Sequence, residues 1–195
     1  SRCVQHSPIV NMFGSDSMAE GYPKARPPVH ERILAQARAH LSMALPARWA
    51  LDLGCGSGVS TRTVRGLAQT IVGIEPEHSM LCWARKLVPD AHFATAAAER
   101  LPLTSESIDL VTAAGSLNFA DVEQALPKIR GVLAPTGSLV IYDFSQGAEF
   151  PHSIALANWH AEFKTRYPSP PPARPFDPKS LPYAPSGLKL DVLTP

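Results

Sequence analysis

The stretch LDLGCGSGVSTR, residues 51–62, holds an aspartate followed by three glycines at alternate positions. Gly54, Gly56 and Gly58 come directly after an apolar run that is typical of a buried parallel strand. Glycine adopts backbone conformations that other residues avoid, and it allows a ligand to approach the main chain closely. Ligands of parallel sheets bind beyond the carboxyl ends of the strands, beside unpaired N–H groups of the next helix. The spacing therefore predicts a ligand-binding loop, with a tight turn that binds nothing as the alternative.

An acidic residue, Glu75, stands at the end of the next apolar run. Glu75 is expected to face the same crevice and to accept hydrogen bonds from both hydroxyls of a ribose. The dinucleotide spacing Gly-x-Gly-x-x-Gly differs from the spacing found here. Asp52 would repel a pyrophosphate, but it suits a positively charged ammonium or a network that orients the loop's own N–H groups. A cofactor with an adenosine end, an amino-acid end and no phosphate fits this pattern, and S-adenosylmethionine is such a molecule.

Short apolar runs alternate with helix-like segments from about residue 29 to residue 144, which predicts an α/β domain. The expected strands are Trp49–Leu53, Thr70–Ile74, Ala91–Ala94, Ile108–Ala113 and Ser138–Asp143. The expected helices are Glu31–Leu45, Val59–Leu67, His78–Val88, Val122–Leu133 and Phe150–Tyr167. We expect these elements to form a doubly wound sheet, mostly parallel, with helices on both faces.

Length and composition restrict the classes of protein and partner. A chain of 195 residues with 45% hydrophobic residues suits one globular domain, which we place at residues 29–195. The net charge of +1 and the lack of a polybasic run argue against nucleic acid or an anionic membrane as partner. The chain has neither a bilayer-length apolar run nor a secretory signal at its start, so we expect a cytoplasmic protein. Cys3, Cys55 and Cys82 lack the spacing of a zinc site, so no metal is expected.

Four segments within about residues 10–145 together resemble the class I S-adenosylmethionine-dependent methyltransferases. The segment ALDLGCGSG is similar to the family's first motif, and GIEPEHSML is similar to its second. ATAAAERLPLTSESIDLVTAAGSLNFAD resembles its adenine-binding and fourth-strand region, and IRGVLAPTGSLVIYDF resembles its penultimate helix, glycine turn and fifth strand. The chain looks most like the small-molecule branch, which includes ubiquinone-biosynthesis and trans-aconitate methyltransferase-like enzymes. The resemblance implies a Rossmann-like fold, S-adenosyl-L-methionine as cofactor, S-adenosyl-L-homocysteine as product and a small-molecule methyl acceptor.

The resemblance also assigns cofactor contacts. The glycine loop and Ala114 would line the methionine portion, and Glu75 the ribose. The family often has an acid at the position of Ala97 that holds the adenine amine, a role that Glu99 or backbone groups could take here. The complete set of expected cofactor contacts in this part of the chain is Asp52, Gly54, Cys55, Gly56, Gly58, Glu75, Pro76, Met80, Ala97, Ala98, Glu99 and Ala114. Met80 as ordinary core and Glu99 as solvated surface are the alternatives.

Three residues after the fourth strand, Ser116, Asn118 and Phe119, are expected to face the acceptor. Asn118 and Phe119 replace a His–Trp pair that is common in trans-aconitate-like relatives, so that substrate is not assumed. Residues 1–28 resemble the family's N-terminal lid, in which Tyr22 and Arg26 would contact the cofactor. Arg26 could form a forked contact with a carboxylate, and a surface Arg beside a Tyr that packs on proline is the alternative.

The implied reaction is a direct in-line displacement that needs no metal, so the protein's main task is positioning. His152 and His160 could serve as a general base, but a polar histidine on a helix face is the more common role, and we assign no catalytic residue. Two alternatives remain open: a cofactor-binding pseudo-enzyme or partner subunit, and an NAD-dependent oxidoreductase. A homo-oligomer is compatible with each of them.

The C-terminal segment GLKLDVLTP, residues 187–195, alternates apolar and polar residues as one half-buried strand would. The family's sheet ends in an antiparallel hairpin, for which this chain offers only that one strand. We therefore expect at most six strands and an incomplete hairpin. We also expect the 195-residue chain to be a fragment or to lack residues, and to methylate poorly without a partner or the missing part.

Overall fold

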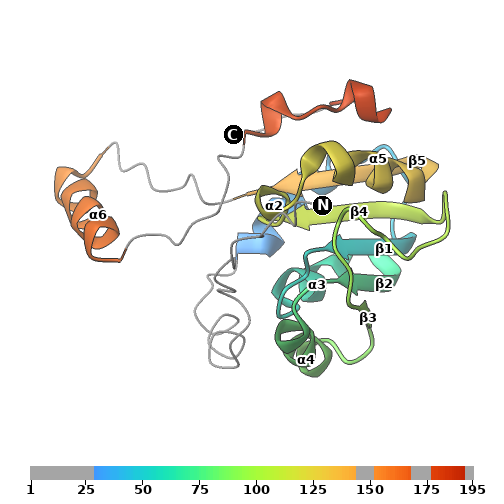
Figure 1. Ribbon diagram of the computed structural model, residues 1–195, viewed down its shortest axis with the longest axis horizontal. Coiled ribbons are helices and arrows are strands. Elements are labelled where there is room, and N and C mark those ends of the chain that lie inside the picture. The colour runs from blue at the N-terminus through green and yellow to red at the C-terminus, as the bar shows by residue number, and fades with distance from the viewer. Residues whose placement is uncertain (1–28, 144–151, 168–176, 192–195) are drawn as a thin grey trace, which may run out of the picture.

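The computed structural model describes residues 29–143, 152–167 and 177–191 (Figure 1). The predicted lid at residues 1–28, with Tyr22 and Arg26, lies outside the described residues, and its role stays a prediction.

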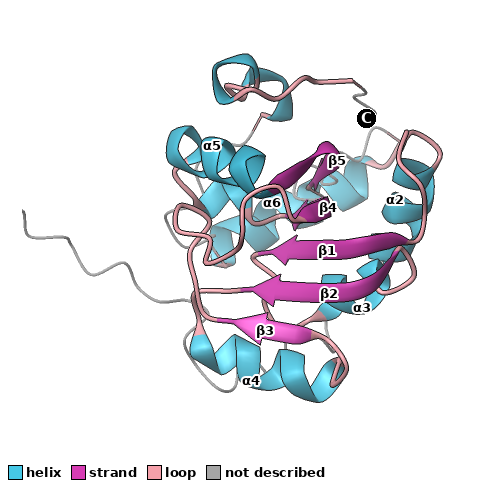
Figure 2. Cartoon of the chain, turned by 90° about the vertical axis from the view of Figure 1, so that its right-hand side faces the viewer, coloured by secondary structure: helices cyan, strands magenta, loops and turns pink. Residues whose placement is uncertain are grey.

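Five strands form one sheet in the order β3-β2-β1-β4-β5. All four pairs of neighbouring strands are parallel, and the arrows of β1, β2 and β3 point the same way in Figure 2. The chain moves outward from β1 to β3 and then returns to the other side of β1, so the strand order switches between β1 and β4. Such a switch opens a crevice at the carboxyl ends of these two strands. The strands are β1 (Ala47–Leu53), β2 (Ala68–Ile74), β3 (His92–Ala94), β4 (Ile108–Ala114) and β5 (Leu133–Tyr142).

Helices cover both faces of this sheet. Side chains alternate between the faces along a strand. On β1, Leu51 packs in one hydrophobic cluster together with Ile129 of α5, whereas Ala50 packs in a second cluster with Leu34 of α2 and Val64 of α3. The predicted doubly wound, mostly parallel fold is therefore confirmed, and within the described residues the sheet is entirely parallel. The α-helices are α2 (Val29–Arg38), α3 (Val59–Val64), α4 (His78–Leu87), α5 (Val122–Val132) and α6 (Ile154–Arg166).

The first described helix is shorter than predicted, because α2 ends at Arg38 and not at Leu45. The amide of Ala39 donates to the carbonyl of Gln36, a three-residue spacing that tightens and closes the last turn. The segment that follows is irregular, and Leu45 packs from there against the second cluster. The apolar spacing of residues 39–45 thus reflects packing of a loop, not of a helix.

The fifth strand begins earlier than predicted. β5 starts at Leu133, directly after α5, and its register with β4 jumps from Ile108 opposite Leu133 to Leu110 opposite Ser138. The glycine turn that the resemblance implies between α5 and the fifth strand is thus accommodated as a bulge inside the strand. A Cβ on Gly137 would lie 3.0 Å from the carbonyl oxygen of Ile108, so a glycine is needed where the two strands approach each other.

The predicted sixth strand is not formed over residues 187–191, and residues 192–195 lie outside the described part. Gly187 has a φ of 73° and ends the short 3-10 helix η3 (Ala184–Ser186). The amide of Leu188 then donates to the carbonyl of Tyr183 at 2.9 Å, so this backbone closes a local turn instead of pairing with a strand. Leu188 packs partly buried against the first cluster, which accounts for its apolar character.

Candidate functional site

The loop after β1 contains three glycines that all have positive φ, at 66° for Gly54, 53° for Gly56 and 88° for Gly58. A Cβ on Gly54 would lie 2.4 Å from the Cβ of Ser116, and one on Gly58 would lie 3.0 Å from the Cα of Ala84. A Cβ on Gly56 would meet nothing within 4 Å. Packing within the protein therefore explains the first and third glycines, and the second is the one that faces open space.

Asp52, at the end of β1, is fully buried and accepts three hydrogen bonds from hydroxyl groups. Ser60 Oγ lies 2.7 Å and Thr61 Oγ1 lies 2.6 Å from Asp52 Oδ2, and Thr112 Oγ1 lies 3.1 Å from Asp52 Oδ1. Burial raises the pKa of Asp52, and these hydroxyl bonds oppose that rise. Since Ser60 and Thr61 belong to α3 and Thr112 to β4, Asp52 fastens the elements on both sides of the loop. Its predicted contact with a cofactor stays a prediction.

Glu75, at the end of β2, lies directly against the open glycine. Its Oε2 accepts a hydrogen bond from the Gly56 amide at 3.1 Å, and its Oε1 accepts one from the Glu77 amide at 3.1 Å. The amides of Gly54 and Cys55 both donate to the carbonyl of Ile74, which folds the loop across the end of β2. Burial raises the pKa of Glu75, which is 9% exposed, while the two amide bonds lower it. The structure thus brings together the glycine loop and Glu75, which the sequence analysis assigned to the same ligand.

The remaining predicted cofactor residues near the adenine position lie on segments that leave β2 and β3. Pro76 is exposed immediately after Glu75, whereas Met80 of α4 is only 2% exposed and forms part of the core. Ala97, Ala98 and Glu99 follow the end of β3 and are partly buried.

Glu99, in the loop after β3, and Ala114, at the end of β4, each contact another part of the fold. Glu99 Oε1 accepts a hydrogen bond from the amide of Asp121 at 2.8 Å, which ties the loop after β3 to the start of α5. Ala114 lies at the end of β4 and packs partly buried against the second cluster.

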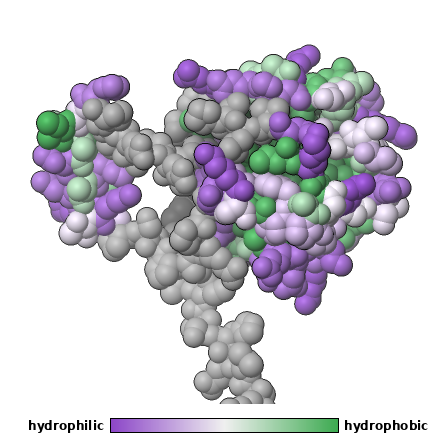
Figure 3. Space-filling view, turned by 90° about the horizontal axis from the view of Figure 1, so that it is seen from above, coloured by the Kyte–Doolittle hydropathy of each residue, from purple (hydrophilic) through white to green (hydrophobic). Residues whose placement is uncertain are grey.

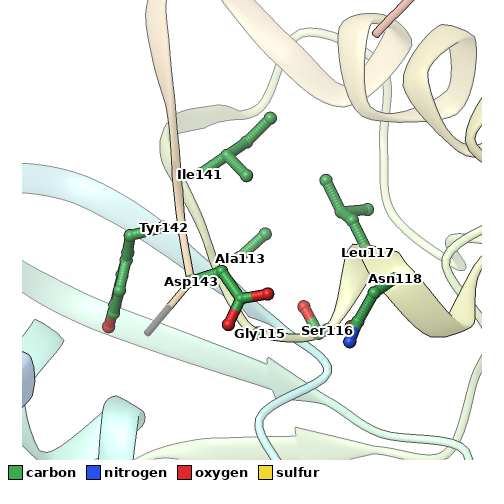
Figure 4. Close-up of a pocket in the computed structure, with 8 residues that line it drawn as sticks. All are labelled: Ala113, Gly115, Ser116, Leu117, Asn118, Ile141, Tyr142 and Asp143. Carbon is green, nitrogen blue, oxygen red and sulfur yellow. The ribbon is translucent and has the colours of Figure 1, made fainter. Parts of the chain in front are cut away.

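A second feature of the same sheet edge is a shallow hollow at the ends of β4 and β5, in which a water-sized sphere finds no room. Figure 4 shows the side chains of Ser116, Asn118 and Asp143 around it. Ser116 Oγ donates to the carbonyl of Leu53 at 2.7 Å. Phe119 is 48% exposed and is not part of the lining. The lining residues are Ala113, Gly115, Ser116, Leu117, Asn118, Ile141, Tyr142 and Asp143.

Asp143 and Tyr142 were not among the residues expected at the site. The signal was nevertheless available, because both end the fifth apolar run and the ends of parallel strands share one edge. His30 Nδ1 of α2 is hydrogen-bonded to Tyr142 Oη at 3.0 Å, and both side chains are buried. Burial and the nearby charge of Asp52 raise the pKa of Tyr142.

The carboxyl edge of the sheet carries negative charge. Burial and the charges of Asp52 and Glu75 together raise the pKa of the Cys55 thiol, which keeps that buried side chain neutral. Asp143 adds a third carboxyl group to this edge. Two oxygen atoms here are buried without a hydrogen-bond partner in the described structure, Ser57 Oγ in the loop and Asn118 Oδ1 beside the hollow. Such an edge favours a ligand that carries positive charge and hydrogen-bond donors.

The two histidines considered as a base lie elsewhere. His152 is exposed just before α6, and His160 is part of α6, none of whose residues is buried. Figure 1 shows α6 apart from the sheet, and Figure 3 shows hydrophobic and hydrophilic side chains exposed together on it. The described residues contain no group of three or more His, Cys, Asp or Glu residues that could hold a metal ion. In the same part of the chain, no helix is both long and apolar enough to cross a membrane.

A family comparison covers the same residues. Residues 51–141 match the family described as "Methyltransferase domain". The match begins inside β1, includes Asp52, the glycine loop and Glu75, and ends inside β5. Residues 51–141 are therefore similar to a methyltransferase domain.

Proteins with a similar sequence agree with this family match, since they are named methyltransferases. Trans-aconitate 2-methyltransferase from Delftia acidovorans is 37% identical over 113 residues, which are 55% of this chain and 42% of the relative. The ubiquinone/menaquinone biosynthesis C-methyltransferase UbiE from Campylobacter jejuni is 31% identical over 103 residues, which are 49% of this chain and 44% of the relative. The predicted resemblance is thereby confirmed. The chain spans less than half the length of these two curated relatives.

A solved structure supports the fold of this domain. It is described as a "putative s-adenosyl-l-methionine-dependent methyltransferase" from Methanococcus maripaludis, and it superposes with a TM-score of 0.64. The superposition covers 84% of this chain and 76% of that chain at 18% sequence identity.

Proposed function

We propose that this domain transfers a methyl group from S-adenosyl-L-methionine to a small-molecule acceptor. The observation that carries the proposal is the contact between Gly56 and Glu75. It places an open backbone position beside a carboxylate at the ends of the two adjacent strands β1 and β2. The family match and its named relatives support the same cofactor and reaction class.

The residues present fit this cofactor. The space beside Gly56 is one that a Cβ would enter without contact, so a ligand can approach the loop backbone there. Glu75 keeps acceptor capacity on both carboxylate oxygens after its two amide bonds, as binding of a ribose diol requires. Asp52 and Glu75 suit a cation and disfavour the pyrophosphate of a dinucleotide. Ser57 Oγ, buried and unpaired in the described structure, supplies one further polar group in the loop.

Each part of the cofactor has proposed partners in this chain. The backbone around Gly56 would bind the amino-acid end, Glu75 the ribose, and Pro76 with the backbone of Ala98 the adenine. When bound, S-adenosyl-L-methionine would supply a methyl group carried by a positively charged sulfur. The protein's contribution would be to hold the acceptor beside that group and to exclude water, and positioning of this kind can supply roughly 7–11 kcal/mol.

Calorimetric titration tests the cofactor assignment. We expect S-adenosyl-L-homocysteine to bind the 195-residue chain and NADH not to bind. Gly56→Val should lower the affinity at least about 100-fold, because the branched side chain fills the ligand's space. Gly187→Val is the matched control, since Gly187 also has a positive φ but lies in the turn after η3. Equal losses in both variants would mean that backbone strain, and not ligand exclusion, causes the effect.

Product analysis separates an enzyme from a pseudo-enzyme. Formation of S-adenosyl-L-homocysteine would be measured over a library of small amines, alcohols, thiols and carboxylic acids. Turnover with one acceptor class supports the proposal, whereas tight cofactor binding without turnover of any acceptor favours a binding role.

A further inference from the structure

The side chain of Cys55, in the glycine loop, is directed at β2. Cys55 is only 3% exposed, and its Sγ lies 2.9 Å from the place that a Cβ on Gly73 would occupy. The amide of Cys55 donates to the carbonyl of Ile74 at 3.0 Å, so its backbone and its side chain are both held against β2. Cys55 therefore anchors the loop to the sheet.

Phe93 of β3 reaches the same place from the neighbouring strand. Gly73 and Phe93 are partners in the parallel ladder, so their side-chain positions lie on the same face of the sheet. Cδ1 and Cε1 of Phe93 each lie 2.6 Å from the place of a Cβ on Gly73. Since Gly73 is not among the glycines with positive φ, its missing side chain serves to leave space and not to permit an unusual backbone. The thiol and the ring converge in that space, a pairing of sulfur with an aromatic ring that is favourable in protein interiors.

The position of Cys55 determines the position of the next residue. Gly56 follows Cys55 directly, and its amide donates to Glu75 Oε2 at 3.1 Å. A shift of the Cys55 side chain away from β2 would therefore move Gly56 away from Glu75, and this is the contact that carries the proposed function.

We propose that Gly73 and Phe93 are positioning residues for the cofactor. Together they form a socket for the Cys55 thiol, and the filled socket holds Gly56 against Glu75. The assignment rests on the proposed function, because it takes the contact between Gly56 and Glu75 to be part of the cofactor site. Gly73 and Phe93 were not among the residues expected at the site, and they act on the ligand only through the loop.

Two compensating substitutions test the socket by calorimetric titration. Gly73→Ala places a methyl group where the thiol and the ring converge, so the affinity for S-adenosyl-L-homocysteine should fall at least about tenfold. Phe93→Leu removes the aromatic partner of the thiol and should lower the affinity by about threefold. The double variant conserves the total side-chain volume approximately, so it should bind within about twofold of the wild-type chain.

Hydrogen exchange of the Gly56 amide, followed by NMR, gives a second measurement that needs no ligand. Exchange should be faster in Gly73→Ala and in Phe93→Leu, and it should return towards the wild-type rate in the double variant. Gly131→Ala is the matched control, because a Cβ on Gly131 in α5 would meet nothing within 4 Å. This control should keep both the affinity and the exchange rate.

Unchanged affinity and exchange in Gly73→Ala would overturn the proposal, and so would a double variant that is more impaired than either single variant. If Gly73→Ala does not fold, unchanged exchange in Phe93→Leu has the same meaning. Failure of S-adenosyl-L-homocysteine to bind the wild-type chain would count against the proposed function alone, since the exchange rates still decide whether the socket positions the loop.

Discussion

The glycine loop after β1 and the hollow at the ends of β4 and β5 lie on the same edge of the sheet, but their polar groups come from different elements. Asp52 accepts three hydroxyl hydrogen bonds and Glu75 accepts two amide hydrogen bonds, all from this chain. In the hollow, Asp143 follows β5 and lies beside Asn118, whose Oδ1 is buried without a partner in the described structure.

This difference suggests that the glycine loop and the hollow have different roles at this edge of the sheet. A loop whose carboxylates are fixed by its own protein is preorganised for one invariant ligand. Each region also holds one buried oxygen without a partner in the described structure, Ser57 Oγ in the loop and Asn118 Oδ1 beside the hollow. The proposed cofactor side is therefore the part that relatives can share.

The largest effect is expected for Glu75→Ala, which should lower the affinity for S-adenosyl-L-homocysteine by roughly 100-fold or more. Two charge-assisted hydrogen bonds to a ribose would be lost, each contributing roughly 1.5–3 kcal/mol. Calorimetry on the folded variant measures the change, with Glu123→Ala as a control on the exposed surface. Unchanged affinity would remove Glu75 from the cofactor side.

Thr61→Val should come next, with a loss of roughly 1.5–3 kcal/mol in the free energy of unfolding. The change keeps the shape of the side chain but removes a hydroxyl that lies 2.6 Å from the buried Asp52 carboxylate. Urea unfolding measures the loss, and Thr104→Val on an exposed loop provides the control. Equal stability in the two variants would mean that Asp52 does not fasten the loop.

Asn118→Leu should act in the opposite direction and raise the free energy of unfolding by about 1 kcal/mol. The unpaired Oδ1 is a cost to the folded protein that an apolar side chain of similar size removes. Urea unfolding would again give the value, with Asn158→Leu on the exposed surface of α6 for comparison. A clear destabilisation would show that the amide is satisfied in solution, and the contrast between loop and hollow would disappear.

The smallest effect is a pH dependence carried by Asp52. Its folded pKa is raised above the ordinary 3.8, so the folded protein holds this proton more tightly than the unfolded chain. The stability that this group contributes is complete below about pH 3.8 and is lost as the pH rises through the folded pKa. Compared with Asp52→Asn, the wild-type protein should therefore become progressively less stable from pH 4 upward. Paired urea titrations between pH 4 and pH 7 measure this difference, and a difference that grows on acidification would contradict it.

The sequence predicts the strands and the loop well because both depend on local pattern. Each of the five expected strands is present, and Gly56 lies against Glu75 as the spacing of the first two strands requires. The end of α2 and the bulge in β5 were not predictable in the same way. Both depend on contacts with other parts of the fold: Leu45 packs against the second cluster, and Gly137 approaches the carbonyl of Ile108.

The residues that lie next to individual glycines were likewise not predictable from local pattern. Gly54 and Gly58 were interpreted as positions where a ligand approaches the backbone. That interpretation stays a prediction, and a side chain at these positions would also meet Ser116, after β4, and Ala84, on α4. The elements that lie beside β1 are set by the topology of the sheet and not by local periodicity. These neighbours could therefore not be identified before the strand order was known. Asp143 was missed although it ends the fifth apolar run, and the carboxyl ends of parallel strands share one edge.

The close approach of Gly54 and Ser116 has a consequence for how this domain can diverge. The two positions are 62 residues apart in the chain, yet one side chain fills the volume that the other leaves empty. A larger residue at position 116 would push into the loop after β1, so the wall of the hollow cannot be enlarged without disturbing the neighbouring loop. Among proteins of this fold, selection for new ligands at this edge should therefore leave position 116 small.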